Sequence, residues 1–256
     1  MTWRPRDCHA HSTWSDGDLA PAEVAAVAAA RGVLPSVADH MSRDVTRSVK
    51  SAEAVREYLD DLATLDVARG GEFCWHDSLW RELPPDLMAG FTHRLGSLHG
   101  VFLPDGTLVH AFASRLPAGL EPDAYMDAHV ANLERMVSEM PVDILAHPTL
   151  LPLPWRSRPL EELWTEPREE RAVEALHRAG IAFEVSARYR PHERFVRRAV
   201  ERGVRISLGS DGHTRDQVGD LTAPLALTRR LGVPDAELYD PVAHGSRTQQ
   251  PVGRGP

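Results

Sequence analysis

The side chains best suited to chemistry in this sequence are histidines and carboxylates that lie just behind short apolar segments. The chain has 13 histidines, and histidine is the commonest metal ligand in proteins. The candidates are His9, His11, Asp16, His40, Glu72, His99, His147, Asp211 and His213, and Asp39 stands directly before His40. Such a mixture of imidazoles and carboxylates suits Zn, Mn or Fe, whereas an all-oxygen set would indicate Mg or Ca. The residue types therefore favour metal-dependent chemistry.

Two pairs of candidates have a spacing that directs both side chains into one space. Residues two apart in a strand point the same way, so His9 and His11 would present two imidazoles together. Asp211 and His213 repeat this spacing, with Gly212 allowing a sharp turn between them. Each remaining candidate, taken alone, is equally consistent with a hydrogen-bonded surface group. The coincidence of so many positions with predicted strand ends argues for coordination.

The number of candidates exceeds what one metal ion can use. A tetrahedral zinc takes about four ligands including water, so nine residues imply two to three divalent ions that share carboxylates. Glu72 and Asp211 are the natural bridges. Paired ions about 3.5–4 Å apart polarise a phosphoryl oxygen, generate hydroxide at neutral pH and stabilise the leaving oxygen. Hydrolysis of a phosphate ester is the chemistry that fits this set best.

Strands and helices that alternate along the chain must position these residues. Short apolar segments predict strands at 33–38, 70–74, 94–98, 143–146, 181–185 and 204–208, and another just before His9. Apolar residues at helical spacing predict helices at 20–30, 51–68, 123–140, 168–179 and 192–202. The alternation implies an α/β fold with a parallel sheet, either a closed barrel or an open doubly wound sheet. In a barrel, the carboxyl ends of the strands meet at one face and would gather the candidates there.

Length and composition exclude several classes of protein. The 256 residues, 42% hydrophobic and 26% charged, are typical of an ordinary globular chain. Two distant cysteines, Cys8 and Cys74, cannot make a disulfide framework. The net charge of -8 gives no basic excess for nucleic acid, and the single lysine, Lys50, is not part of a P-loop.

The expected organisation is one barrel domain at 1–240 followed by a disordered tail at 241–256, which is rich in Gly, Pro and Arg. No apolar run reaches the roughly 18 residues of a membrane span, and the first residues lack the apolar core of a signal peptide. We therefore expect a cytoplasmic protein with no membrane partner. The sequence does not indicate an oligomeric state.

The order of the motifs resembles the polymerase and histidinol phosphatase (PHP) superfamily over about residues 7–220. The matching motifs are His9-x-His11, Ser15-Asp16-Gly17, Asp39-His40, Gly71-Glu72, Gly96-Ser97-x-His99, Ala146-His147-Pro148, Glu184-Val185-Ser186 and Ser210-Asp211-Gly212-His213. The resemblance implies a distorted (β/α)7 TIM-like barrel that hydrolyses phosphoesters. It also implies a trinuclear metal site at the C-terminal ends of the strands.

Carried over by position, the resemblance implies three groups of ligands. His9, His11, Glu72 and Asp211 would hold one ion, Glu72, His99 and His147 a second, and Asp16, His40 and His213 a third. Every ligand position is occupied by a competent residue, which argues against a degenerate, purely structural member of the family. His93, six residues before His99, is the alternative to His99 as a ligand.

Within the superfamily, the layout resembles the stand-alone histidinol-phosphate phosphatases more than the exonuclease domains of polymerases. Ligand types and resemblance together predict a phosphomonoesterase that acts on a small metabolite such as histidinol phosphate through a metal-bridging hydroxide. Ser186 stands where those phosphatases usually have Asn, and residues 76–122 match no pattern that we identify. Two alternatives remain: a phosphodiesterase or nuclease acting on nucleotides or nucleic-acid ends, and a non-catalytic, metal-stabilised regulatory domain.

Three side chains are candidates for substrate contacts. Arg188 follows the predicted strand at 181–185 and could grip a phosphate with its guanidinium. Arg43, just past His40, is a second cationic candidate, and His192 could protonate a leaving oxygen. The alternatives are solvated loop arginines and a histidine that caps a helix. Glu184 could orient a metal ligand from behind it.

Overall fold

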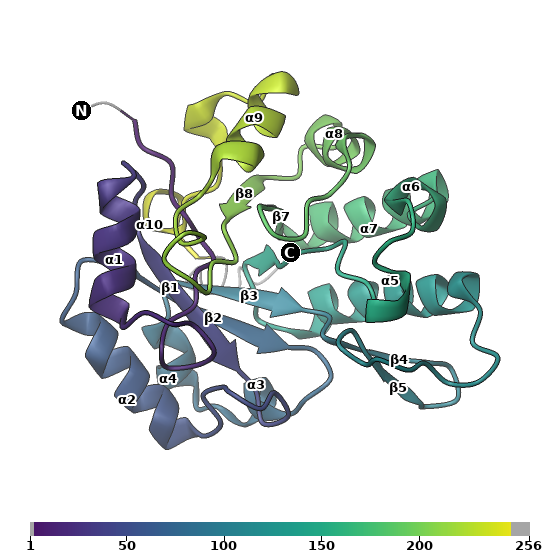
Figure 1. Ribbon diagram of the computed structural model, residues 1–256, viewed down its shortest axis with the longest axis horizontal. Coiled ribbons are helices and arrows are strands. Elements are labelled where there is room, and N and C mark those ends of the chain that lie inside the picture. Colours follow the sequence, from purple (N-terminus) through teal and green to yellow (C-terminus); the bar gives the residue numbers. More distant parts are fainter. Residues whose placement is uncertain (1–2, 247–256) are drawn as a thin grey trace, which may run out of the picture.

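The computed structural model describes residues 3–246 and contains one curled, six-stranded parallel sheet (Figure 1). The strands lie in the order β1 (Ser36–Met41), β2 (Ala68–Cys74), β3 (His93–Ser97), β6 (Ile144–Leu145), β7 (Ala182–Ser186) and β8 (Ile206–Gly209). Nearly every strand residue is buried, as in parallel sheets whose two faces are both covered. The predicted distorted TIM-like α/β barrel is confirmed.

The opening segment closes the barrel between its two edge strands. The backbone nitrogen of Cys8 donates to Leu208 O of β8 (2.9 Å), and Ala38 N of β1 donates to Ala10 O (2.8 Å). Isolated parallel bridges join Arg6 to Leu34 and Ala10 to Gly212. This segment therefore takes the place of the strand predicted before His9, although its pairing is too interrupted to make a regular strand.

The predicted helices form the outer layer of the barrel (Figure 1). They are α1 (Pro21–Ala30), α2 (Ala52–Ala63), α5 (Pro122–Glu139), α7 (Glu166–Ala179) and α8 (Glu193–Glu201). The structure adds α9 (Thr222–Arg230), which the sequence analysis did not predict. Ser51 caps α2 through its side chain, and Gly180 ends α7 in the left-handed conformation that glycine adopts most readily. Shorter helices are α3 (Leu79–Glu82), α4 (Pro85–Gly90), α6 (Leu160–Leu163) and α10 (Pro241–His244), and short 3-10 turns lie at Leu153–Trp155 and Asp235–Glu237.

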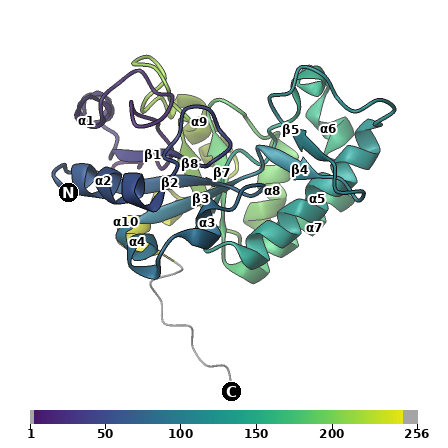
Figure 2. The same ribbon diagram turned by 90° about the horizontal axis from the view of Figure 1, so that it is seen from below.

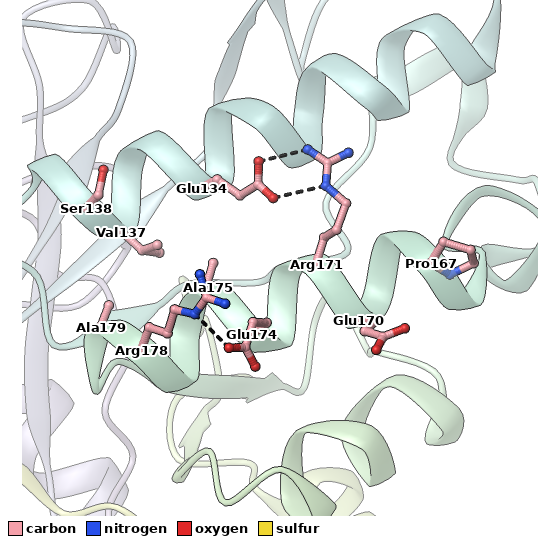
Figure 3. Close-up of a pocket in the computed structure, with 10 residues that line it drawn as sticks. All are labelled: Glu134, Val137, Ser138, Pro167, Glu170, Arg171, Glu174, Ala175, Arg178 and Ala179. Carbon is pink, nitrogen blue, oxygen red and sulfur yellow. Dashed lines mark hydrogen bonds and ion pairs between the residues drawn. The ribbon is translucent and has the colours of Figure 1, made fainter.

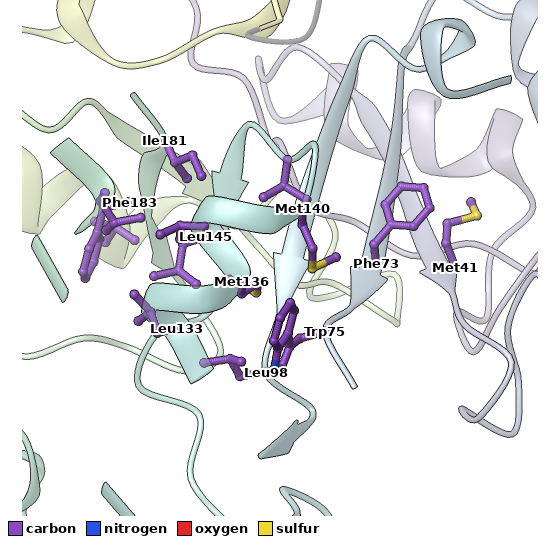
Figure 4. Close-up of a cluster of buried hydrophobic side chains, with 14 of the residues drawn as sticks. Met41, Phe73, Trp75, Leu98, Leu133, Met136, Met140, Leu145, Ile181 and Phe183 are labelled. Carbon is purple, nitrogen blue, oxygen red and sulfur yellow. The ribbon is translucent and has the colours of Figure 1, made fainter. Parts of the chain in front are cut away.

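Two apolar clusters lie on opposite faces of the curled sheet. The larger one joins strand residues such as Phe73, Leu145 and Phe183 to Leu133 and Met136 of α5 (Figure 4). A second, smaller cluster consists of Cys8, Ala38, Leu95, Ile144, Ala146, Ala182 and Tyr239. Its members Ile144 and Ala182 are the strand neighbours of Leu145 and Phe183. Because successive strand residues point to opposite faces, the smaller cluster fills the inside of the barrel.

The region that sequence reasoning left without a structure contains an antiparallel hairpin, β4 (Gly100–Phe102) and β5 (Leu108–His110). Figure 2 shows it beside α5, away from the main sheet. Asn132 of α5 attaches it: the side chain accepts from Phe102 N (3.1 Å) and donates to Phe102 O (2.8 Å). Three-residue strands without apolar alternation give too weak a pattern to be predicted.

Two predicted boundaries are wrong. The first strand begins at Ser36 rather than 33, because Leu34 pairs with Pro5 and Asp7 of the opening segment instead. Residues 241–246, predicted as part of the tail at 241–256, are ordered, since α10 starts at Pro241 and buried Ser246 contacts Arg94 (2.7 Å) and Asp143 (2.8 Å). Residues 247–256 lie outside the described part of the chain. Among residues 3–246, no helix combines the length and the apolar character that crossing a membrane requires.

Candidate metal centre

All nine candidate ligands lie together at the carboxyl-terminal end of the barrel. They form four overlapping groups in which the possible ligand atoms lie within 4.8 Å of one another. The groups are His9, Glu72 and His147; His9, His11 and Asp211; His40, Glu72 and His99; and His11, Asp16, His40 and His213. Six separate stretches of chain contribute, as expected where all strands of a barrel end at one face.

Glu72, near the end of β2, connects two of these groups. Its Oε1 lies 2.8 Å from His147 Nε2 and 3.3 Å from His99 Nε2, and its Oε2 lies 3.6 Å from His9 Nε2. The side chain is fully buried. Burial alone would raise the pKa of Glu72, but the surrounding histidines, with His99 foremost, hold it well below its usual value. Glu72 is thus an ionised carboxylate in the position of a bridge.

Asp211 and Asp16 complete the cluster toward solvent. Asp211 Oδ1 lies 3.3 Å from His11 Nε2, and Asp211 belongs to one group only. Asp16 Oδ2 lies 3.2 Å from His213 Nε2, and its Oδ1 lies 3.5 Å from His40 Nε2. The Asp16 side chain is 33% exposed, whereas the Glu72 side chain is inaccessible. The cluster therefore has a closed floor and an open upper end.

Buried groups behind the cluster fix two of its histidines. Glu184 of β7 accepts a hydrogen bond from His9 Nδ1 (2.9 Å) and another from the backbone nitrogen of His147. Gly209 makes room for this carboxylate, because a Cβ there would lie 2.0 Å from Glu184 Oε1. With Nδ1 donating to Glu184, His9 presents the lone pair of Nε2 to the cluster. A carboxylate behind a histidine is the usual way to orient a metal ligand.

Backbone conformation is also unusual at the cluster. His147 (φ 27°) and Asp211 (φ 51°) are the only non-glycine residues with positive φ between residues 3 and 246. Such conformations are costly for residues with a side chain and concentrate at functional sites. Both residues belong to the groups described above.

The cluster fits divalent cations on the chemistry of its donors. His40 Nδ1 and Glu72 Oε2 lie 2.6 Å apart, yet neither atom has a hydrogen-bond partner of acceptable geometry in the described part of the chain. Burial lowers the pKa of His11 to about 3, with help from neighbouring His40, so its imidazole is neutral. The Glu72 and Asp16 carboxylates instead raise the pKa of His40 to about 10, and metal ions displace such a proton when they bind. Imidazoles and carboxylates without other partners are the ligand types that suit Zn²⁺, Mn²⁺ and Fe²⁺.

Two other polar residues that sequence reasoning considered have structural partners instead. Asp39, next to His40, accepts from Ser12 N (2.8 Å), Ser12 Oγ (2.7 Å) and Ser15 Oγ (2.5 Å) and so fixes the loop that carries Asp16. His93 Nε2 lies 2.8 Å from Cys8 O, and His93 is in none of the groups. Its place in the cluster is taken by His99.

A cavity of about 580 Å³ lies over the cluster. Arg188 lines it, with one guanidinium nitrogen 2.8 Å from His213 Nδ1. Tyr189, Phe112 and Arg47 also line it. The sequence analysis missed these three residues. Phe112 and Arg47 lie in segments without a recognisable pattern. Tyr189 could equally have been a core aromatic residue, and its position next to Arg188 was the only signal that it lies at the cavity.

The two other predicted substrate contacts do not line this cavity. Arg43 is 52% exposed and pairs with Glu82 of α3. His192, which precedes α8, lies with Nε2 3.0 Å from Glu169 Oε1 of α7. Each prediction assumed that nearness in sequence to a strand end brings a side chain to the barrel mouth, but helix packing directs both elsewhere.

A second cavity, about 790 Å³, lies on the outer surface between α5 and α7 (Figure 3). Its arginines are already paired, Arg171 with Glu134 (2.8 Å) and Arg178 with Glu174 (2.7 Å). Titratable groups with strongly shifted pKa values gather instead at the barrel mouth, which is typical of functional sites. The cavity over the cluster is therefore the candidate site.

Comparisons with known proteins support the fold. No protein-family model and no curated protein matches the chain. Among solved structures, the chain is similar to the histidinol phosphate phosphatase of Lactococcus lactis subsp. lactis Il1403, which was solved with Zn, L-histidinol and phosphate. The identity is 14% over 93% of this chain and 95% of that chain, with a TM-score of 0.67. An uncharacterized protein matches with 13% identity, 96% of this chain, 75% of that chain and a TM-score of 0.47. The likeness to the phosphatase shows that this chain has a PHP-like barrel fold.

Proposed function

We propose that the protein is a metal-dependent phosphatase that hydrolyses phosphomonoesters of a small metabolite, with histidinol phosphate as the leading candidate. The observation that carries the proposal is the convergence of nine ligand-type side chains in one cluster, six of which line the cavity above it. The similar fold of a histidinol phosphate phosphatase solved with Zn and phosphate supports it.

We infer that this cluster holds two to three divalent ions (Zn, Mn or Fe), with Glu72 as the shared ligand. When bound, such ions lower the pKa of a coordinated water and neutralise the charge that develops on a phosphoryl group. The residues of this chain hold the ions and orient His9 and His147 through Glu184. They also exclude water from the closed floor.

Arg188 is the residue that we propose to bind the non-bridging phosphate oxygens. It reaches over the cluster from the loop after β7, and its guanidinium matches the geometry of phosphate. Tyr189 and Phe112 supply apolar surface for the organic part of the ester. A cavity of about 580 Å³ is in the size range of small-molecule sites, which favours a metabolite over a nucleic acid.

The experiment that tests the function is a hydrolysis screen with the purified chain, supplemented with Zn²⁺, Mn²⁺ or Fe²⁺. Phosphomonoesters including histidinol phosphate are compared with phosphodiesters, and bound metal per chain is counted on the same sample. We expect phosphate release from monoesters with two to three ions per chain. Faster cleavage of diesters would favour the nuclease alternative, and full metal occupancy without turnover would favour a non-catalytic domain.

Matched variants separate the proposed site residues from their neighbours. His99→Gln should lose bound metal and activity, whereas His93→Gln, also a buried histidine of the same region, should keep both. Arg188→Ala should lower kcat/KM about 10–100-fold, which corresponds to the roughly 1.5–3 kcal/mol of a hydrogen bond to a charged group. Arg190→Ala, two residues away and exposed, is its control. Equal effects within either pair would contradict the assignments.

A further inference from the structure

A fifth group of ligand-type residues lies on the wall of the cavity and shares no residue with the nine-residue cluster that the other four groups form. Asp44 comes from the loop after β1, His76 from the turn after β2 and His110 from the end of β5. Their possible ligand atoms lie within 4.8 Å of one another, and all three residues line the cavity. Sequence reasoning gave these histidines no role, because only the hairpin β4–β5 brings His110 next to His76.

The geometry of the three residues is that of a site open on one side. Asp44 Oδ2 lies 2.9 Å from His76 Nε2 and 3.6 Å from His110 Nδ1. The two imidazole rings meet edge to face with centroids 5.2 Å apart. The His76 side chain is 2% exposed, whereas those of Asp44 and His110 are 51% and 43% exposed. One buried ligand and two exposed ones would leave coordination positions open toward the cavity.

The backbone of the hairpin holds the His76 ring in place. A Cβ at Gly100 would lie 2.7 Å from His76 Cγ and 3.0 Å from its Nδ1, so only glycine allows β4 to pack this closely on the ring. This packing buries Nδ1 and leaves Nε2 as the atom that reaches Asp44.

The charge of Asp44 is not balanced by a basic side chain. Within residues 3–246, its carboxylate approaches only the two histidines, and no arginine or lysine pairs with it. Two imidazoles and one carboxylate with open positions form a donor set that suits Zn²⁺ and other first-row divalent ions. We propose that Asp44, His76 and His110 form a further site for a divalent transition-metal ion, separate from the nine-residue cluster.

The test counts ions in the full chain. Bound metal is first removed from the protein with a chelator. The protein is then equilibrated with increasing Zn²⁺ by dialysis, and the bound zinc per chain is measured by mass spectrometry. The parent is compared with Asp44→Asn and His110→Gln, which change exposed side chains and should leave the fold intact, as melting curves without metal will check. His177→Gln, an exposed histidine of α7 away from the cavity, is the control.

We expect the parent and His177→Gln to bind one more ion per chain than Asp44→Asn and His110→Gln at the same free zinc. Removing the hydrogen-bond partner of a metal ligand weakens metal affinity about 10–100-fold. Replacing a ligand itself should weaken the affinity for zinc by at least this factor. Equal stoichiometry and affinity in all four proteins would overturn the site. Because the readout is a difference in bound ions, it holds whether or not the nine-residue cluster binds metal or the protein hydrolyses phosphoesters.

Discussion

Single residues behind the cluster determine how its ligands are presented. Glu184 is the clearest case, because it contacts the ring nitrogen of His9 and the backbone of His147 without belonging to any ligand group. His147 has a positive φ that its side chain disfavours, and the hydrogen bond from its backbone nitrogen helps to hold this conformation. Glu184 is therefore a positioning residue for two candidate ligands at once.

Replacing Glu184 with glutamine should weaken metal binding. The amide keeps the volume but removes the charge that orients His9, so we expect affinity for the first ions to fall about 10–100-fold. Competition with a coloured chelator measures this affinity directly. Excess metal should restore the ion count of the variant.

The control is Glu169→Gln, which alters another fully buried glutamate that pairs with Arg194 and Arg198 far from the cluster. This variant should lose thermal stability and keep its metal affinity. If both glutamine variants bind metal as the parent does, Glu184 does not position the ligands.

At the scale of elements, the hairpin β4–β5 extends the barrel mouth, and Asn132 of α5 hydrogen-bonds to it. Asn132 acts as a strand partner for β4 by bonding both backbone groups of Phe102, and it also accepts from Trp75 Nε1 (2.8 Å). The hairpin carries His110, and the segment after it carries Phe112, so its attachment shapes one wall of the cavity.

Asn132→Leu should loosen this wall. The substitution keeps a similar volume but leaves the backbone groups of Phe102 and the Trp75 indole without partners, at a cost of about 1–3 kcal/mol in the free energy of unfolding. Hydrogen exchange at residues 100–110 should become faster than in the parent, while exchange in β7 and β8 stays the same. Ser138→Ala, an exposed change on the same helix, serves as the control.

At the scale of the whole molecule, folding buries several histidines, and the titration of a buried histidine couples folding to pH. His129 of α5 lies outside the ligand groups, between Tyr125 and Trp164, and is 1% exposed. Burial lowers its pKa to about 4. An unfolded chain would take up this proton near pH 6.5, before the folded chain does. His129 therefore opposes folding as the pH falls below about 6.5.

His129→Gln should flatten the acid side of the stability profile. Between about pH 6.5 and 4 the parent should lose up to about 1.4 kcal/mol per pH unit through this residue, or about 3 kcal/mol in all. The variant should not show this pH-dependent loss. Any destabilisation from poorer packing of glutamine should be the same at every pH, including pH 8, and so should not change the slope. Urea unfolding of chelator-treated protein across this range measures the difference. An unchanged slope, matching that of His177→Gln, would show that His129 does not titrate in this way.

Residue types and spacing were enough to predict the alternating elements and the set of nine candidate ligands. Strands that are buried on both faces and helices with one apolar face leave strong local patterns. Ligand-type residues directly behind strands become informative because all strands of a parallel barrel end at one face. His9, His40 and Asp211 could therefore be related to one another without any knowledge of the fold in space.

Only the tertiary structure decided which other side chains reach the cavity. Arg43 and His192 were near strand ends in sequence but pair with Glu82 and Glu169 on the outer helices. Contacts such as Asn132 with the hairpin, or Asp44 with His76 and His110, join segments that are distant along the chain. Periodicity records only whether a residue faces the core or solvent, and not its partner across the fold. The residues of the main cluster could therefore be predicted from the sequence, whereas the residues that form the walls of the cavity could not.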